Sequence, residues 1–311
     1  MNYTLSNITF KSSDGKNTIH AKIYIPKVKD IRGIVQLAHG MTDHTGRYEA
    51  LADYLTGEGY VFAGNDHLGH GESAACDEDF GFFAEKDGYD LVLRDLHAMN
   101  RILRERFLGI KPVIMGHSMG SFLSRLYVEK YPHTISGHII HGTGGPMGPV
   151  LPLGKALVKL IMLFRGKRYR SKLVANMAFM GYNSKFPKEE GSVAWLTRDV
   201  ARVSGDDRNK YTTFIFTLAA YYDLFTIVGK SNSKKWFDSY PKSLPTLVMS
   251  GDMDPVGNYG KGPEYVYKHL LMEGVGELSL KMYEGARHEL FNETCRDEVF
   301  ADVKSWLDAR S

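Results

Sequence analysis

The sequence contains very little cysteine and no long apolar run. Its two cysteines, Cys76 and Cys295, lie far apart and form no Cys-x-x-Cys pair, which excludes a zinc ribbon and a disulfide-stapled scaffold. The longest apolar stretch, residues 156–164, is interrupted by Lys159 and is too short for a transmembrane helix. The N-terminus also lacks the basic and apolar segments of a secretory signal, so we expect a cytoplasmic protein.

An excess of one charge sign is lacking as well. The 39 Lys and Arg residues nearly balance the 36 Asp and Glu residues, which leaves a formal net charge of +3. This balance argues against nucleic-acid binding, and no stacking or groove-reading motif supports such binding. A chain of 311 residues with 43% hydrophobic residues is long and apolar enough to bury a full core without metals or disulfides.

Short apolar runs alternate with amphipathic segments along most of the chain. Alternation in residues 3–10 and 18–25, around the turn Ser12-Ser13-Asp14-Gly15, predicts an antiparallel hairpin. Further strands are predicted at residues 33–38, 60–63, 112–115, 135–140, 246–250 and 278–283, and helices at 48–57, 88–108, 119–130, 263–272 and 299–309. Strands alternating with helices predict an α/β fold with a mostly parallel sheet and helices on both faces.

One long segment breaks this alternation. From Pro146 to about Leu244 the sequence has no buried-strand pattern and is rich in helix formers and aromatic residues. A crossover between parallel strands needs only about a dozen residues or more. We therefore predict a core formed by residues 1–146 and 245–311 and an inserted helical cap, or lid, formed by residues 147–244.

A Gly-x-Ser-x-Gly motif follows one predicted strand directly. Residues 116–120 read Gly-His-Ser-Met-Gly, between the strand ending at Met115 and the helix beginning near Met119. This strand–turn–helix setting is the one that a nucleophile elbow requires, so Ser118 is the candidate nucleophile. Gly116 and Gly120, on either side of the serine, leave room for the neighbouring backbone in such a sharp turn.

A serine nucleophile needs a base and an acid that orients the base. His288 follows the last predicted strand and is the candidate base. Asp252 and Asp254 both follow the preceding strand, and their spacing alone does not choose between them as the acid. The oxyanion donors are expected to be the backbone N–H groups of Met119 and of Met41, which follows Gly40 in the loop after residues 33–38.

No metal or cofactor is needed for this chemistry. His39 and His44 are five residues apart without a matching carboxylate, so a zinc site is not favoured. The segment Gly142–Gly145 follows a strand but does not form a dinucleotide-binding motif.

At these residues the sequence resembles the α/β-hydrolase superfamily, and in particular its monoglyceride lipase, lysophospholipase and serine aminopeptidase-like branch. The matching stretches are HGMTDHTGRY (39–48), NDHLGHGES (65–73), GHSMG (116–120), SGDMDPVGN (250–258) and YEGARHELFNE (283–293). The family pattern Gly-x-x-Asp falls on Gly251 and Asp254, so the resemblance implies that Asp254 is the acid. It likewise implies Met41 and Met119 as the oxyanion donors and a structural role for Asp66.

The predicted cap is strongly basic in its first part. Residues 151–187 contain no Asp or Glu and eight basic residues, which are Lys155, Lys159, Arg165, Lys167, Arg168, Arg170, Lys172 and Lys185. Such a segment predicts transient contact with an anionic membrane surface, contact with an acidic substrate group, or only a solvated charged face. Among the apolar residues of the whole predicted cap, Leu157, Ile161, Phe179 and Tyr222 are candidates for the wall of a substrate pocket.

The sequence therefore predicts a serine hydrolase that cleaves carboxylic esters through an acyl-enzyme, such as a carboxylesterase or a monoacylglycerol lipase or lysophospholipase-like enzyme. The expected ligand is a small ester or lipid, and no feature indicates an oligomeric state. An aminopeptidase of the same fold would need a pocket carboxylate for the substrate's amino group, for which Glu189 and Glu190 are the candidates. The same motifs are also compatible with a thioesterase and with a non-catalytic receptor of this fold.

Overall fold

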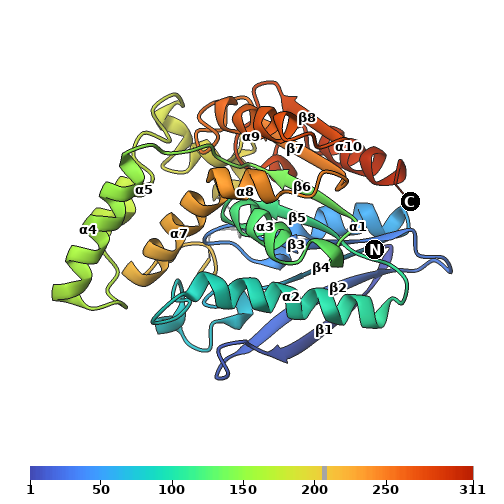
Figure 1. Cartoon of the computed structure of the whole chain (residues 1–311), viewed down its shortest axis with the longest axis horizontal. Coiled ribbons are helices and arrows are strands. Elements are labelled where there is room, and N and C mark those ends of the chain that lie inside the picture. The colour runs from blue at the N-terminus through green and yellow to red at the C-terminus, as the bar shows by residue number, and fades with distance from the viewer. Residues whose placement is uncertain (205–208, 311) are drawn as a thin grey trace.

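The computed structural model describes residues 1–204 and 209–310, which form one twisted eight-stranded sheet with helices on both faces (Figure 1). The strand order is β1-β2-β4-β3-β5-β6-β7-β8. The strands are β1 (Tyr3–Lys11), β2 (Thr18–Pro26), β3 (Gly33–Ala38), β4 (Tyr60–Asn65), β5 (Val113–His117), β6 (Gly137–His141), β7 (Thr246–Gly251) and β8 (Leu278–Tyr283). The predicted mostly parallel sheet is confirmed.

The first two strands form the antiparallel edge of the sheet. β1 pairs with β2 from Tyr3 opposite Pro26 to Lys11 opposite Thr18, and β2 pairs antiparallel with β4. The Asp14 carboxylate closes the hairpin by accepting hydrogen bonds from the backbone N–H groups of Lys16 and Asn17. From β4 to β8 every strand pair is parallel, so the carboxyl ends of these strands meet at one edge.

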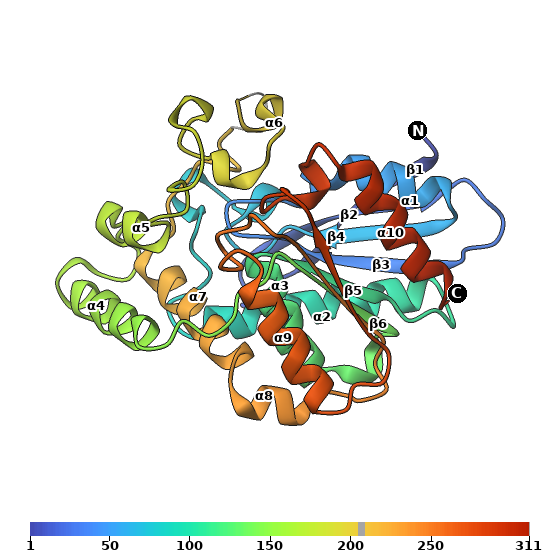
Figure 2. The ribbon, with the colours of Figure 1, turned by 90° about the horizontal axis from the view of Figure 1, so that it is seen from above.

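Two helical layers cover the sheet because alternate strand residues face opposite sides. Val113 and Met115 of β5 pack with the layer formed by α1 (Glu49–Gly57) and α10 (Arg296–Asp308). Ile114, between them, packs with the other layer. That layer consists of α2 (Gly88–Arg106), α3 (Met119–Lys130) and α9 (Lys261–Met272), and Figure 2 shows the two layers on either side of the sheet.

The segment between β6 and β7, which we call the β6–β7 insertion, is helical and projects beyond one end of the sheet (Figures 1 and 2). Its described helices are α4 (Val150–Arg165), α5 (Lys172–Ala178), α6 (Val200–Ser204), α7 (Leu218–Ser231) and α8 (Lys234–Ser239). α7 packs against α4 on one side and against α2 and α3 on the other, so it joins the insertion to the core. Within residues 1–204 and 209–310, no helix is both long and apolar enough to cross a membrane.

Arg125 of α3 attaches the insertion to the core at two places, near its start and at the end of α7. Its side chain is fully buried and donates to the Gly144 carbonyl at 3.4 Å, to the Ser231 carbonyl, and to Asn232 Oδ1 at 3.1 Å. The guanidinium also lies 4.3 Å from the centre of the Trp236 ring. Burial lowers the pKa of Arg125 to about 9. The oxygen atoms named above, which stabilise this buried cation, belong to carbonyl groups and not to a carboxylate.

Three basic residues of the insertion contact the core. Lys167 Nζ donates to the Glu85 carbonyl at 2.6 Å, and Arg168 pairs with Asp79 at 3.0 Å. Arg170 donates to the carbonyls of Glu78 and Phe80. These interactions join the loop after α4 to the core segment 78–85, so these three basic residues contribute to attaching the insertion.

At the junction between β5 and α3, two glycine positions have no room for a side chain. A Cβ atom on Gly116 would overlap the Gly120 carbonyl oxygen and Ser124 Oγ, and one on Gly120 would overlap the Ala38 carbonyl oxygen at the end of β3. Glycine at both positions lets β3, β5 and α3 approach one another closely.

We predict that Gly120→Ala lowers the free energy of unfolding by about 3 kcal/mol, because the new methyl group would have to displace rigid backbone. Urea unfolding measures the change. Gly276→Ala is the control, since a Cβ there meets no atom closer than 3.9 Å. Equal stabilities of the two variants would contradict this account of the junction.

Candidate active site

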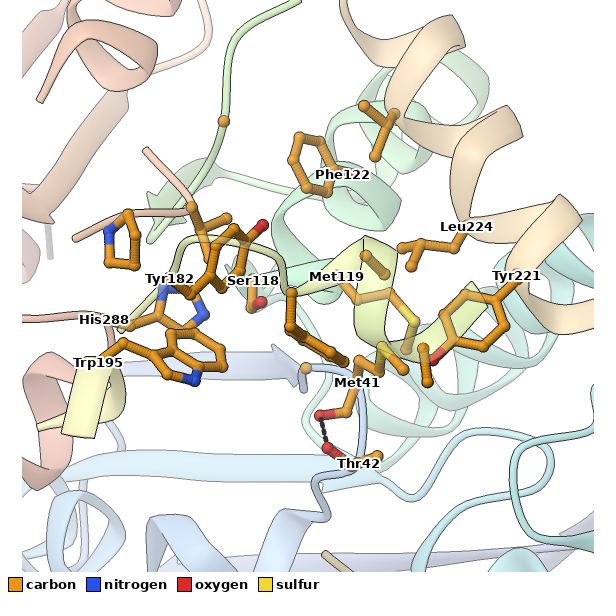
Figure 3. A pocket seen from close by; sticks show the side chains of 18 of the residues that line it. Met41, Thr42, Ser118, Met119, Phe122, Tyr182, Trp195, Tyr221, Leu224 and His288 are labelled. Carbon is orange, nitrogen blue, oxygen red and sulfur yellow. Dashed lines mark hydrogen bonds between the residues drawn. The ribbon is translucent and has the colours of Figure 1, made fainter. Parts of the chain in front are cut away.

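Ser118 occupies a sharp turn between β5 and α3. Its φ and ψ are 54° and −120°, a strained backbone for a residue other than glycine. The turn is held by hydrogen bonds from the Ser118 N–H to the His141 carbonyl and from the Ser121 N–H to the Ser118 carbonyl. The Ser118 side chain lines a large cavity and lies beside the imidazole of His288 (Figure 3).

His288 and Asp254 form a buried pair in the loops after β8 and β7. His288 Nδ1 lies 2.9 Å from Asp254 Oδ2, and both side chains are almost inaccessible to solvent. Asp254 also accepts a hydrogen bond from the Val256 N–H at 2.8 Å. Asp252, the other aspartate in this loop, instead accepts from the Gly285 N–H at 2.7 Å and has no contact with His288 that would orient it.

Met41 and Met119 both line the cavity beside Ser118 (Figure 3). Thr42 has a left-handed backbone with φ 49°, and its hydroxyl donates to the Met41 carbonyl at 2.7 Å. Among the hydrogen bonds of the described residues, none uses the backbone N–H of Met41 or Met119 as a donor to a protein atom. Two backbone donors therefore remain available next to the serine.

Two neutral histidines lie behind His288. The Leu290 N–H donates to His141 Nε2, so the proton of the neutral His141 ring is on Nδ1. His141 Nδ1 then donates to His117 Nδ1 at 3.1 Å. Burial lowers the pKa of His141 to about 3 and that of His117 well below its ordinary value. Neither ring places a positive charge beside His288.

The cavity has a volume of about 1160 Å³ and a mostly apolar wall. The insertion supplies most of the wall, from α4, α5, α7 and the connections between them. Of the residues predicted to line a pocket, Leu157 and Phe179 do so, whereas Ile161 and Tyr222 are not among the lining residues. Tyr222 instead lies under the ammonium groups of two lysines of α4, and its neighbour Tyr221 faces the cavity.

Aromatic residues of the insertion cover His288. The ring centres of Trp195 and His288 are 5.1 Å apart, and Tyr182 packs edge-on against Trp195. The backbone is engaged too, because the His288 N–H donates to the Trp195 carbonyl and the Glu289 N–H to the Leu196 carbonyl. Trp195 is not among the residues predicted from the sequence. A tryptophan in an inserted segment was the only signal available for it.

A buried ionic network lies at the polar end of the cavity. Arg47 donates to both carboxylate oxygens of Glu289, at 2.9 and 2.7 Å, and to Asp43 Oδ1 at 3.1 Å. Asp43 also accepts from the Tyr48 hydroxyl and the Gly40 N–H. Burial alone would raise the pKa of Asp43, but the Arg47 guanidinium and these donors hold that pKa well below its ordinary value.

Other polar residues discussed from the sequence have structural partners. Asp66 accepts from the Thr45 N–H at 2.8 Å and the Glu72 N–H at 2.9 Å, which joins two loops near the site. Both ring nitrogens of His39 are engaged, by the Gly40 carbonyl and the His67 N–H. Glu190 pairs with Arg287 at 2.5 Å, and neither Glu190 nor Glu189 lines the cavity.

We predict that Asp43→Asn lowers the free energy of unfolding by about 3 kcal/mol at neutral pH, because the buried Arg47 loses one anionic partner. The folded-state pKa of Asp43 is depressed, so its stabilisation is present above the unfolded-state value near 3.9. The difference between wild type and variant should therefore shrink as pH falls below about 4. Urea unfolding across this range measures it.

Asp238→Asn, at an exposed pair with Lys234, is the control and should change stability little at any pH. A pH-independent difference for Asp43→Asn would show that lost packing, not lost charge, causes the effect.

Comparison with known proteins agrees with this geometry. Residues 29–295 match the family "Serine aminopeptidase, S33". The monoacylglycerol lipase of Mycolicibacterium smegmatis is 25% identical over 284 residues, which cover 89% of each chain. The monoglyceride lipase of Saccharomyces cerevisiae is 28% identical over 288 residues, 90% of this chain and 85% of that one. The crystal structure of a highly thermostable carboxyl esterase from Bacillus coagulans superposes with a TM-score of 0.89 at 28% identity, over 99% of both chains. The chain therefore belongs to the serine aminopeptidase S33 family of α/β-hydrolases.

Proposed function

We propose that the protein is a serine esterase that hydrolyses monoacylglycerols. The observation that carries this proposal is the large apolar cavity that has Ser118, His288 and two available backbone donors on its wall, with the buried Asp254 paired to His288. The similarity to monoacylglycerol and monoglyceride lipases supports the choice of substrate. In this proposal the β6–β7 insertion is the cap predicted at residues 147–244, which encloses the acyl chain.

The proposed reaction proceeds through an acyl-enzyme. Ser118 Oγ attacks the ester carbonyl while His288 Nε2 takes its proton, and Asp254 holds the imidazole in place and stabilises its positive charge. The Met41 and Met119 N–H groups stabilise the oxyanion. His288 then protonates the leaving alkoxide, which departs as glycerol. Water, deprotonated by His288, attacks the acyl-enzyme and releases the fatty acid and free Ser118.

The polar end of the cavity favours a substrate with neutral hydroxyl groups over one that carries an ammonium group. Asp43 and Glu289 are the carboxylates that line the cavity beside Ser118, and both are paired with Arg47. No lining carboxylate of the described residues is thus left for the ammonium group of an aminopeptidase substrate. Paired carboxylate and guanidinium groups still offer hydrogen bonds to neutral hydroxyls such as those of glycerol.

We predict that wild type releases fatty acid and glycerol from medium-chain monoacylglycerols and that Ser118→Ala loses this turnover entirely. Asp254→Asn should lower kcat by about four orders of magnitude, since the imidazole loses its orienting anion. Asp252→Asn is the matched control and should change kcat by less than about threefold, because Asp252 accepts a hydrogen bond from the Gly285 N–H and none from His288. Quantification of both products by chromatography measures the rates.

Circular dichroism confirms that each variant is folded before its rate is compared. Wild-type turnover by folded Ser118→Ala would contradict the proposed nucleophile. A larger effect of Asp252→Asn than of Asp254→Asn would move the acid to Asp252.

The outer face of the insertion suits a lipid surface, and we propose that the enzyme takes its substrate from one. Leu160, Leu163 and Phe164 of α4 are mostly exposed, as are Leu173 and Met180 in and after α5. The exposed basic residues Lys159, Arg165 and Lys172 lie on the same two helices. Apolar side chains bordered by cations are typical of segments that rest on anionic lipid headgroups.

We predict that the double substitution Leu163→Asp and Phe164→Asp weakens binding to phosphatidylglycerol vesicles by at least about tenfold, because two apolar side chains can no longer enter the lipid. Hydrolysis of soluble p-nitrophenyl butyrate should be unchanged, since neither residue lines the cavity. Vesicle co-sedimentation measures the binding.

Leu108→Asp, at an equally exposed position directly after α2, is the control, because the C-terminal end of α2 lies away from the insertion (Figure 1). Undiminished vesicle binding by the double variant, or an equal loss in Leu108→Asp, would exclude this face as the contact.

A further inference from the structure

One polar group in the wall of the cavity has no hydrogen-bonding partner. Tyr221 of α7 is completely buried, and its hydroxyl oxygen makes no hydrogen bond within the structure. Tyr221 lines the cavity, and Figure 3 shows its hydroxyl pointing from α7 toward the side chains of Met41 and Met119. This is the region where the acyl chain of a bound ester would begin.

Three other buried tyrosines have hydrogen-bonded hydroxyl groups. The hydroxyl of Tyr48 donates to Asp43 at 2.6 Å, that of Tyr127 pairs with Thr134, and that of Tyr240 pairs with Thr246. Tyr221 therefore differs from them in lacking a partner while facing an apolar space. A buried hydroxyl without a hydrogen bond is costly, and folded proteins satisfy most such groups.

Packing alone does not account for this hydroxyl. The rings around Tyr221 belong to phenylalanines, with Phe216 at 5.7 Å and Phe225 at 6.3 Å between ring centres. A phenylalanine at position 221 would fill the same space without a polar atom. The hydroxyl is thus a donor and an acceptor presented to whatever occupies the cavity.

We propose that Tyr221 is a specificity-determining residue for acyl chains that carry a hydroxyl group. The proposal rests on the proposed function, because it assigns the cavity to the acyl chain. The Tyr221 hydroxyl exchanges a hydrogen bond with the hydroxyl of the bound chain, and the remaining wall contacts its apolar carbons. A plain acyl chain enters the same cavity but leaves the tyrosine unsatisfied.

The chain supplies a matched control at the next residue. Tyr222 has the same side chain on the same helix, but it does not line the cavity and lies 4.5 Å from Lys155 Nζ. Tyr222→Phe removes the same atom as Tyr221→Phe from the opposite side of the wall. Both variants keep the ring, so the packing of α7 is preserved.

The experiment compares kcat/KM for 1-decanoylglycerol with that for its monohydroxylated isomers, with the hydroxyl placed from the carbonyl end to the far end of the chain. In wild type and Tyr222→Phe, at least one isomer should exceed the plain ester by about tenfold, the effect of one satisfied buried hydrogen bond. In Tyr221→Phe the ratio should fall to about one, because the hydroxyl of the chain loses its hydrogen-bonding partner.

Two results would overturn the proposal. One is a wild-type enzyme that prefers no hydroxylated isomer, and the other is a preference that survives in Tyr221→Phe. Calorimetric binding of hydroxydecanoic and decanoic acids to Ser118→Ala tests the same hydrogen bond without turnover. If no ester is hydrolysed, the proposed function fails, and the effect of adding Tyr221→Phe on these two affinities alone decides the role of Tyr221.

Discussion

The close approach of β3, β5 and α3 at Ser118 is the constraint on which the rest of the site depends. Glycine at positions 116 and 120 lets the helix backbone touch the end of β3. This contact places the N–H at the start of α3 beside the loop after β3, where Met41 lies. The strained turn of Ser118 and the pair of available backbone donors are consequences of one packing arrangement. The favourable packing of β3, β5 and α3 at this junction offsets the strain of the turn.

Much of the fold and the principal site residues could be predicted from the sequence because both are local patterns. Short apolar runs mark the parallel strands, and Gly-His-Ser-Met-Gly directly follows one of them. His288 follows the last strand, and parallel strands bring such loops to one edge. The choice between Asp252 and Asp254 was different in kind. It depends on the path of a loop, and only the family pattern favoured Asp254, which lies 2.9 Å from His288.

The wall of the cavity could not be predicted, because it depends on which side of each helix faces inward. α7 is dense in aromatic and aliphatic residues on all sides, so its sequence has no polar face to set its rotation. Adjacent residues then point about 100° apart, and Tyr221 rather than Tyr222 faces the cavity. The network of Arg47 and Glu289 joins residues 242 positions apart, and only the folded chain shows such a partnership.

The hydrogen bonds from the His288 and Glu289 N–H groups to the Trp195 and Leu196 carbonyls limit how the insertion can move. A rigid movement of the insertion away from the sheet would pull on the loop that carries His288. Arg125 imposes a similar restriction near the start of the insertion and at the end of α7, through Gly144 and Ser231. The loop between α4 and α5 is attached elsewhere, to the core segment 78–85, through Lys167, Arg168 and Arg170. The aromatic residues that cover His288 and the backbone of its loop therefore form one unit, in which a displacement of either part would displace the other.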